Sequence, residues 1–207
     1  MSNPNAAKLH SRVQWRPRAA AWALVLLCGA CGDPPGDGIL LAASRLGEAY
    51  RWEEAKPLVT AYLQYHPEDA AAHYLLGQYY LHAARPNLII ALGEFHTALN
   101  RFRRGRTAGA LGALMSPVEF EADIHRRIAL AHMRMAREAL KAGLPPPVAQ
   151  PQLVQALDHV RKALALTPDV KVLREMKETL ERYIEPLKKT PPPPSQELLE
   201  PDVHLTT

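Results

Sequence analysis

Cysteine is almost absent from this 207-residue chain, which contains only Cys28 and Cys31. Both lie near the amino end, so no disulfide can cross-link the residues that follow, and the stability of that part must come from packing. The two form a Cys-x-x-Cys sequence, which in other settings is a redox pair or half of a zinc site. A redox motif would follow a strand, whereas a hydrophobic run precedes this one, and a zinc site needs two further ligands.

Strand patterns and long hydrophobic runs are also missing. No alternating Val, Ile and Thr segments are joined by Asn-Gly or Asp-Gly turns, so strands are not expected. Residues 38–187 follow a helical period throughout, which predicts an all-α fold. The uncharged stretch at residues 19–30 is 12 residues long, and a membrane-spanning helix needs about 20.

Catalytic motifs are equally lacking. The sequence has no Gly-x-Ser-x-Gly, no phosphate-binding glycine loop and no dinucleotide fingerprint. His125 and His132 are seven residues apart and share a helix face, but no acid lies at ligand spacing from both. We therefore expect a protein that is not an enzyme and that holds no metal, cofactor or small-molecule substrate.

Positive charge is confined to the amino end. The net charge is +4, but residues 1–30 hold Lys8, Arg12, Arg16 and Arg18 and no acid. Beyond residue 30, the 21 basic residues equal the 21 acidic ones. The body of the chain is thus neutral, and a nucleic-acid partner is not expected.

The amino end resembles the signal of bacterial lipoproteins. A basic segment (residues 8–18) and the hydrophobic stretch 19–30 precede Gly29-Ala30-Cys31, like the family's lipobox, although Cys28 replaces the usual Leu. The resemblance implies that residues 1–30 are removed, that Cys31 carries lipid, and that residues 31–37 are a linker. The protein would then be lipid-anchored in the cell envelope, facing the periplasm. Simple secretion and an uncleaved inner-membrane protein are the alternatives.

A repeated pattern runs through the body of the chain. A small residue is followed by a bulky one four positions later, another three after that, and then Leu. The pattern occurs at residues 55–67, 91–99 and 156–168. It resembles the second helix of the tetratricopeptide repeat (TPR), and His73 to Tyr80, with Leu76-Gly77, resembles the first.

The resemblance implies an all-α array of about three TPR-like hairpins over residues 38–187. Residues 103–117 and 143–151 would be insertions, and a stripe of hydrophobic residues at 170–185 predicts a capping helix. Residues 188–207, with Pro191 to Pro194, are expected to be a disordered tail.

In the TPR family the first helices line a groove that binds a peptide segment. The groove residues carried over to this chain are Ala42, Leu46, Tyr50, His73, Leu76, Tyr80, Ala84, His125, Ile128 and His132. They include no Lys or Arg of the kind that holds a carboxylate. A separate basic patch comprises Arg101, Arg103, Arg104 and Arg106. It is either a contact for anionic lipid or acidic partners, or a helix end favoured by the helix dipole.

These features predict a membrane-tethered module that binds a partner protein in the envelope. Analogy with TPR lipoproteins suggests a role in the assembly of a pilus, secretion or outer-membrane complex. The alternatives are an accessory subunit, or an enzyme with a site in the two insertions, or an uncleaved inner-membrane TPR protein. The link from repeat to function is by analogy of fold.

Overall fold

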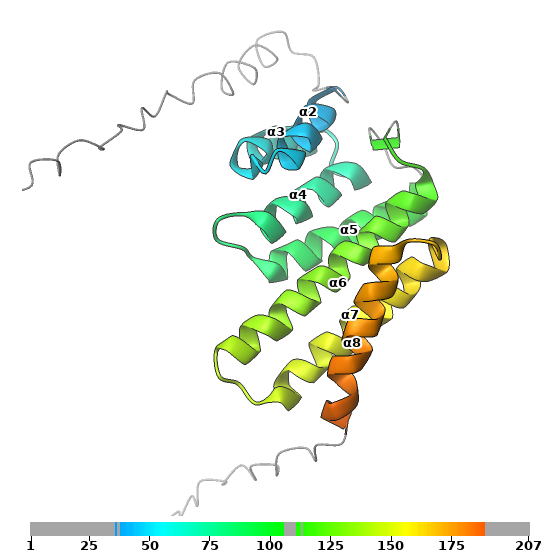
Figure 1. Cartoon of the computed structure of the whole chain (residues 1–207). Helices are drawn as coiled ribbons and strands as arrows, with labels where there is room; N and C mark the ends of the chain where they lie inside the picture. Colours follow the sequence, from blue (N-terminus) through cyan, green and yellow to red (C-terminus); the bar gives the residue numbers. More distant parts are fainter. Residues whose placement is uncertain (1–35, 37, 106–110, 113, 189–207) are drawn as a thin grey trace, which may run out of the picture. The chain divides into compact units, whose positions relative to one another are not determined.

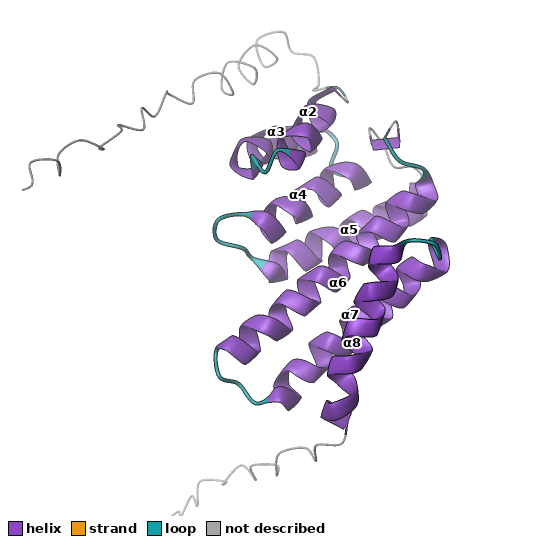
Figure 2. Cartoon of the chain, in the orientation of Figure 1, coloured by secondary structure: helices purple, strands orange, loops and turns teal. Residues whose placement is uncertain are grey.

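The computed structural model describes residue 36 and residues 38–105, 111–112 and 114–188 (Figure 1). This part of the chain forms seven α-helices and no strand, as Figure 2 shows. The helices are α2 (Gly38–Glu48), α3 (Trp52–Tyr65), α4 (Ala70–His82), α5 (Leu88–Gly105), α6 (Pro117–Lys141), α7 (Pro146–Leu166) and α8 (Lys171–Lys188). The prediction of an all-α helical-hairpin array is confirmed.

Several predictions concern residues outside this description. The signal segment 1–30, Cys31 and residues 189–207 of the tail lie outside the described residues. Within the described ranges, no helix is long and apolar enough to cross a membrane.

The helices pack in the order in which they occur in the sequence. Helix α2 pairs with α3, α4 with α5, and α6 with α7, and α8 packs on α7 (Figure 1). Helix α4 also contacts both α2 and α6. The three first helices of the hairpins therefore lie next to one another, and α8 occupies the place predicted for a capping helix.

Local sequence sets where the longest helix begins. Ser116 accepts a hydrogen bond from the backbone N–H of Glu119 at 3.3 Å, and the Glu119 carboxylate accepts one from the backbone N–H of Ser116 at 2.8 Å. This is a reciprocal capping box, and Pro117 occupies the first helical position, where its missing N–H is not needed. These contacts fix the residue at which α6 begins. They thereby also determine which side of the helix each of its residues lies on.

The buried side chains form two clusters. The first joins helices α2 to α5 with the first half of α6, and Phe95, Phe102 and Phe120 are its largest fully buried side chains. The second joins the remainder of α6 to α7 and α8, through residues such as Val160, Leu180 and Ile184. Helix α6 contributes to both clusters and so links the two halves of the body.

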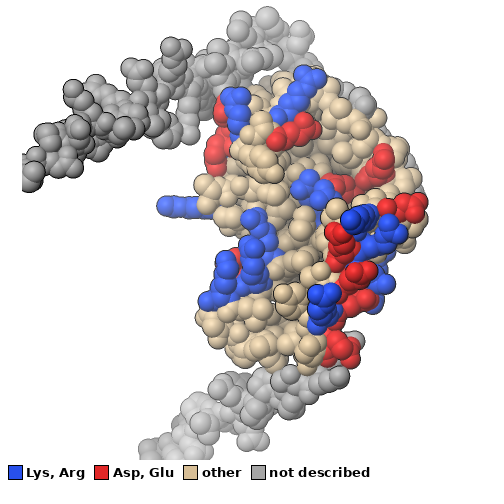
Figure 3. All heavy atoms as spheres, viewed as in Figure 1, with Lys and Arg blue, Asp and Glu red and all other residues tan. Residues whose placement is uncertain are grey.

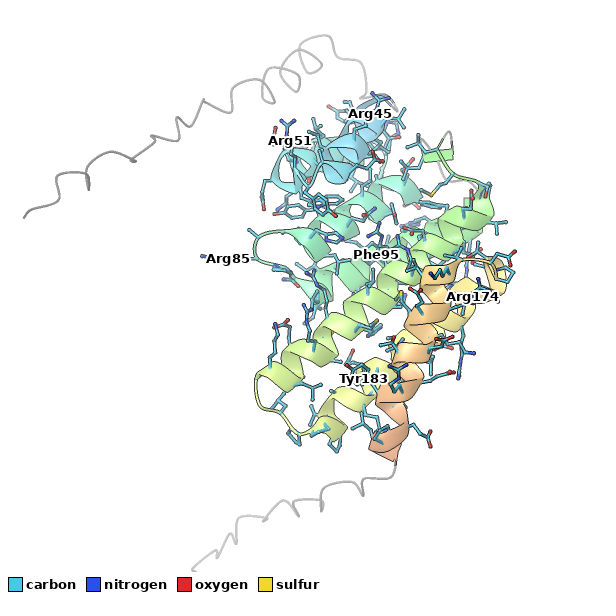
Figure 4. All side chains as sticks on the ribbon, viewed as in Figure 1. Arg45, Arg51, Arg85, Phe95, Arg174 and Tyr183 are labelled. Atoms are coloured by element: carbon cyan, nitrogen blue, oxygen red, sulfur yellow. The ribbon has the colours of Figure 1, made fainter. Side chains whose placement is uncertain are left out.

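Phe95, labelled in Figure 4, lies against a glycine of the neighbouring helix. A Cβ atom added to Gly77 would lie 2.7 Å from two carbons of the Phe95 ring, closer than side chains tolerate. Phe95 is buried and its ring also packs against Tyr74, so it has little room to move. Helices α4 and α5 can therefore approach this closely only with glycine at position 77.

Alanine at Gly77 should therefore destabilise the protein by about 1–3 kcal/mol through overpacking, although alanine is the better helix former by about 1 kcal/mol. The matched control is Gly93→Ala on α5, because a Cβ atom there meets nothing within 4 Å. That variant should gain about 0.5–1 kcal/mol. Urea unfolding followed by circular dichroism measures both. If both substitutions stabilise the protein, close helix approach is not the reason for glycine at 77.

Candidate functional site

Two pockets lie beside helices α4 and α6 and share His82 in their linings. The first, called the apolar pocket below, has a volume of about 480 Å³ and is bounded by α4, α6, α7 and α8. The second, called the polar pocket, has a volume of about 320 Å³ and is bounded mainly by α2, α4 and α6. Because both linings include His82, the two pockets adjoin each other and are described together as the candidate site.

The apolar pocket is lined mostly by aliphatic side chains. Its lining includes Leu81, Leu130, Met133, Ala136, Leu140, Leu153, Leu180 and Tyr183. Tyr183, labelled in Figure 4, belongs to α8 and is 64% exposed, so the pocket is bounded by an aromatic ring that solvent still reaches. The only charged side chains in the lining, among the described residues, are Arg134 and Arg137 of α6.

One side of α6 supplies residues to both pockets. Asp123, Arg126 and Arg127 line the polar pocket, and Leu130, Arg134 and Arg137 line the apolar one. These positions recur every three or four residues, which places them on one helix face. Lys and Arg side chains gather on the left-hand side of the view in Figure 3. The site is therefore built along a basic stripe of α6, named the arginine stripe for Arg126, Arg127, Arg134 and Arg137.

Asp123 anchors the polar end of this stripe. It accepts hydrogen bonds from Arg126 at 2.6 Å, from Arg127 at 3.2 Å and from the hydroxyl of Tyr74 on α4. Burial by itself would raise the pKa of Asp123, but the two arginines and the Tyr74 hydroxyl outweigh it and lower the pKa below its ordinary value. Burial and the Asp123 charge in turn raise the pKa of Tyr74. Asp123 is therefore ionised and Tyr74 protonated at neutral pH, as the hydrogen bond from the hydroxyl to the carboxylate requires.

His82 marks the junction of the two pockets. A guanidinium can only donate, so Nε2 of His82 accepts a hydrogen bond from Nη1 of Arg127, at 3.5 Å. The His82 ring also stacks on Trp52, with ring centroids 5.4 Å apart. Burial, together with Arg127, Arg134 and Arg126, lowers the pKa of His82 to about 4. His82 is therefore neutral at pH 7, and its surroundings are strongly cationic.

Ser44, His82 and Asp123 all line the polar pocket, which raises the question of a catalytic triad. In such a triad the carboxylate must orient the imidazole. Here the Asp123 oxygens bind Tyr74, Arg126 and Arg127, and His82 accepts from Arg127. The three side chains therefore do not form such a relay.

Only part of the predicted groove lies in this site. Tyr50 lines the polar pocket, where its backbone adopts φ +56°. Leu46, Leu76 and Tyr80 instead pack against the first core cluster. His73 hydrogen-bonds Glu94 of α5 at 2.7 Å and the carbonyl oxygen of Pro67 at 2.9 Å. These four residues bind helices to one another rather than lining a pocket.

The residues predicted on α6 face away from the site. His125 is 2% exposed and Ile128 is fully buried, so neither can contact a partner at the surface. His132 hydrogen-bonds Gln152 of α7 at 2.7 Å. The groove prediction is corrected here, because α6 lines the pockets with the arginine stripe.

The predicted basic patch is partly neutralised. Arg101 pairs with Glu68, and Arg103 pairs with Glu121 at 2.8 Å. Arg104 is exposed, and Arg106 lies outside the described residues. Two of the four arginines thus hold helices and loops together. The arginine stripe on α6, which the sequence analysis missed, is the cationic feature that lines the two pockets.

Histidines gather at the contact of α5, α6 and α7, apart from the pockets. Arg103 donates to Nε2 of His125 at 3.3 Å, so the Nδ1–H of His125 donates to Nδ1 of His159 at 3.0 Å. The rings of His96 and His132 lie 5.8 and 6.1 Å from that of His159. Burial, with nearby cations, lowers the pKa of His125 to about 4 and that of His159 to about 3. No set of three ligands suited to a metal ion occurs within the described ranges.

Comparison of this chain with known protein families, with curated proteins and with solved structures gave no match.

Proposed function

We propose that this protein is a membrane-tethered protein–protein interaction module of the bacterial cell envelope. Its TPR-like hairpin array binds a segment of a partner protein, and Cys31 carries the lipid that holds the array at the membrane on the periplasmic side. The observation that carries the binding role is the pair of adjoining pockets along α4 and α6. The lipoprotein-type amino end supports the tether.

The pockets suit a protein segment better than a reaction. The apolar pocket offers uncovered aliphatic and aromatic surface, including Leu140 and Tyr183. When a partner covers surface of this kind, the burial favours binding by about 25 cal/mol per Å². The polar pocket offers hydrogen-bonding groups from Ser44, Gln78 and Arg126. Such a combination of an apolar anchor and polar contacts is typical of protein interfaces.

The test is cross-linking in intact cells that produce the tagged full chain, followed by detergent extraction and capture. The un-cross-linked protein should have the mass of residues 31–207 plus diacylglycerol, with or without an N-acyl chain. A cross-linked partner should be captured with the wild type and lost with Leu140→Glu, which places a charge in the apolar pocket. The matched control is Val154→Glu, because Leu140 and Val154 are both 44% exposed but Val154 is outside the pocket lining.

The two readouts test different halves of the proposal. The mass of the full unmodified chain would overturn the lipid tether. A cross-linked partner that Leu140→Glu and Val154→Glu retain equally would overturn the pockets as the binding surface. Circular dichroism of both variants shows that any loss is not due to unfolding.

A further inference from the structure

The charges of the site select the sign of its ligand. Arg134 and Arg137 line the apolar pocket, and no carboxylate lies in that lining among the described residues. Arg134 is held by a hydrogen bond from its guanidinium to the carbonyl oxygen of Leu81, in the last turn of α4. Arg137 lies 3.5 Å from Glu138, with both side chains more than half exposed, and a pair of this kind is weak. Both guanidinium groups can therefore bind an anionic ligand.

The junction between the pockets, at His82, also favours an anionic ligand. Arg127 donates a hydrogen bond to His82, and Arg126 and Arg134 line the two pockets that share this histidine. A cationic ligand side chain would be repelled by these guanidinium groups, whereas a carboxylate would be attracted to them. Among the described residues, two carboxylates line the polar pocket, Asp123 and Glu48, against four arginines in the two linings. They therefore balance only part of the positive charge.

The apolar pocket adds a second requirement. Its walls from α6 and α8 include Leu130, Met133, Leu140 and Tyr183. An aliphatic side chain that enters would be surrounded by carbon atoms and would remove Leu140 and Tyr183 from water, which favours binding. A ligand that carries only charge would leave this surface uncovered.

The length of the site distinguishes a protein segment from a small ion or a single acyl chain. The residues of α6 that line the two pockets extend from Asp123 to Leu140. Along the helix axis these two residues are about 26 Å apart, at 1.5 Å per residue. An extended peptide covers that length with about eight residues. Backbone groups of a peptide can also pair with the polar pocket, which a hydrocarbon chain cannot do.

We propose that the segment bound by these pockets is acidic and carries aliphatic side chains, with its carboxylates on the arginine stripe and a side chain in the apolar pocket. This inference rests on the proposed function and names the chemistry of its partner. The ligand belongs to a separate protein.

The test uses the full chain and three fluorescein-labelled 12-residue peptides, built from Glu and Leu, from Lys and Leu, and from Glu and Ser. Fluorescence anisotropy should show binding of the Glu/Leu peptide alone, weakened by rising salt. Arg134→Glu should weaken it by about tenfold or more, which corresponds to about 1.4 kcal/mol. The matched control is Arg174→Glu on α8, because Arg174 (Figure 4) is exposed and outside both pocket linings.

Each alternative occupant has its own result. Equal binding of the Lys/Leu peptide would overturn the acidic partner. Displacement of the Glu/Leu peptide by vesicles of an anionic phospholipid, but not of a neutral one, would identify a lipid surface instead. A tenfold gain in peptide affinity on removal of residues 189–207 would identify the chain's own end as the occupant. If no peptide binds but Leu140→Glu still abolishes cross-linked capture, this inference fails and the proposed function stands.

Discussion

Replacing Asp123 by asparagine should lower the free energy of unfolding by about 3–5 kcal/mol, because it leaves buried positive charge without its partner. The carboxylate contacts Arg126, Arg127 and the Tyr74 hydroxyl, and the side chains of Asp123 and Arg127 are only 18% and 19% exposed. Asparagine can keep the contact to Tyr74, but it cannot neutralise a guanidinium. Urea unfolding at pH 7 measures the effect.

The control for this substitution is Asp158→Asn on the adjacent helix α7. Asp158 also pairs with a cation, Lys162, at 2.6 Å, but both side chains are 51% exposed. Helix-surface pairs of this kind contribute only about 0.3–0.5 kcal/mol. Similar losses for Asp123→Asn and Asp158→Asn would show that burial of the Asp123 network does not matter. Where the variant remains folded, Asp123→Asn should also bind the Glu/Leu peptide more tightly, since it removes the carboxylate that pairs with Arg126 and Arg127.

Acidification from pH 6.5 to pH 4 should destabilise the protein by about 3 kcal/mol through the His125–His159 pair. This value treats the pair as one group whose pKa is about 2.5 lower in the folded protein than in the unfolded chain, at about 1.4 kcal/mol per pKa unit. The folded pKa values are lowered to about 4 and about 3, so between these values and 6.5 the unfolded chain binds more protons. Stability therefore falls as the pH falls. Protonation at Nδ1 of His159 would remove the acceptor of the His125 hydrogen bond.

Two variants test this assignment in opposite directions. The double variant His125→Leu/His159→Leu should lose less stability on acidification than the wild type. His73→Gln should lose more. Burial lowers the pKa of His73, but the bonds to Glu94 and to the Pro67 carbonyl outweigh it and raise the pKa overall, so this histidine stabilises the fold at acid pH. A urea midpoint that stays constant from pH 7 to pH 4.5 in the wild type would contradict the prediction.

The sequence was sufficient to predict helices, hairpins and the capping helix, but most residues that it placed in a groove lie outside the two pockets. Residues that the resemblance placed in the groove, such as His73, Leu76 and Tyr80, instead pack one helix on another. Neighbouring residues in a helix point about 100° apart, so the pocket-lining positions Tyr74, Gln78 and His82 lie on a different face. A packing motif therefore identifies the residues of the core. It indicates a binding surface only indirectly, as the helix faces that the motif does not occupy.

The arginines show a second limit. Four arginines in six residues suggested a free basic patch at 101–106, but Arg101 and Arg103 pair with Glu68 and Glu121 from distant segments. The arginines that line the pockets are spaced along α6, among hydrophobic residues. Their signal was the three- to four-residue period from Asp123 to Arg137, which could have been recognised from the sequence. That Asp123 would bind Tyr74, 49 positions away, could not.

The division of the core into two clusters has a consequence for hydrogen exchange. Only α6 contributes to both clusters, so α7 and α8 can open as one cooperative unit while α2 to α5 remain closed. Such an opening would remove the Leu153, Leu180 and Tyr183 walls of the apolar pocket and leave the polar pocket complete. Amide protons of α7 and α8 should then become better protected when a ligand fills the apolar pocket, and those of α4 and α5 should change little.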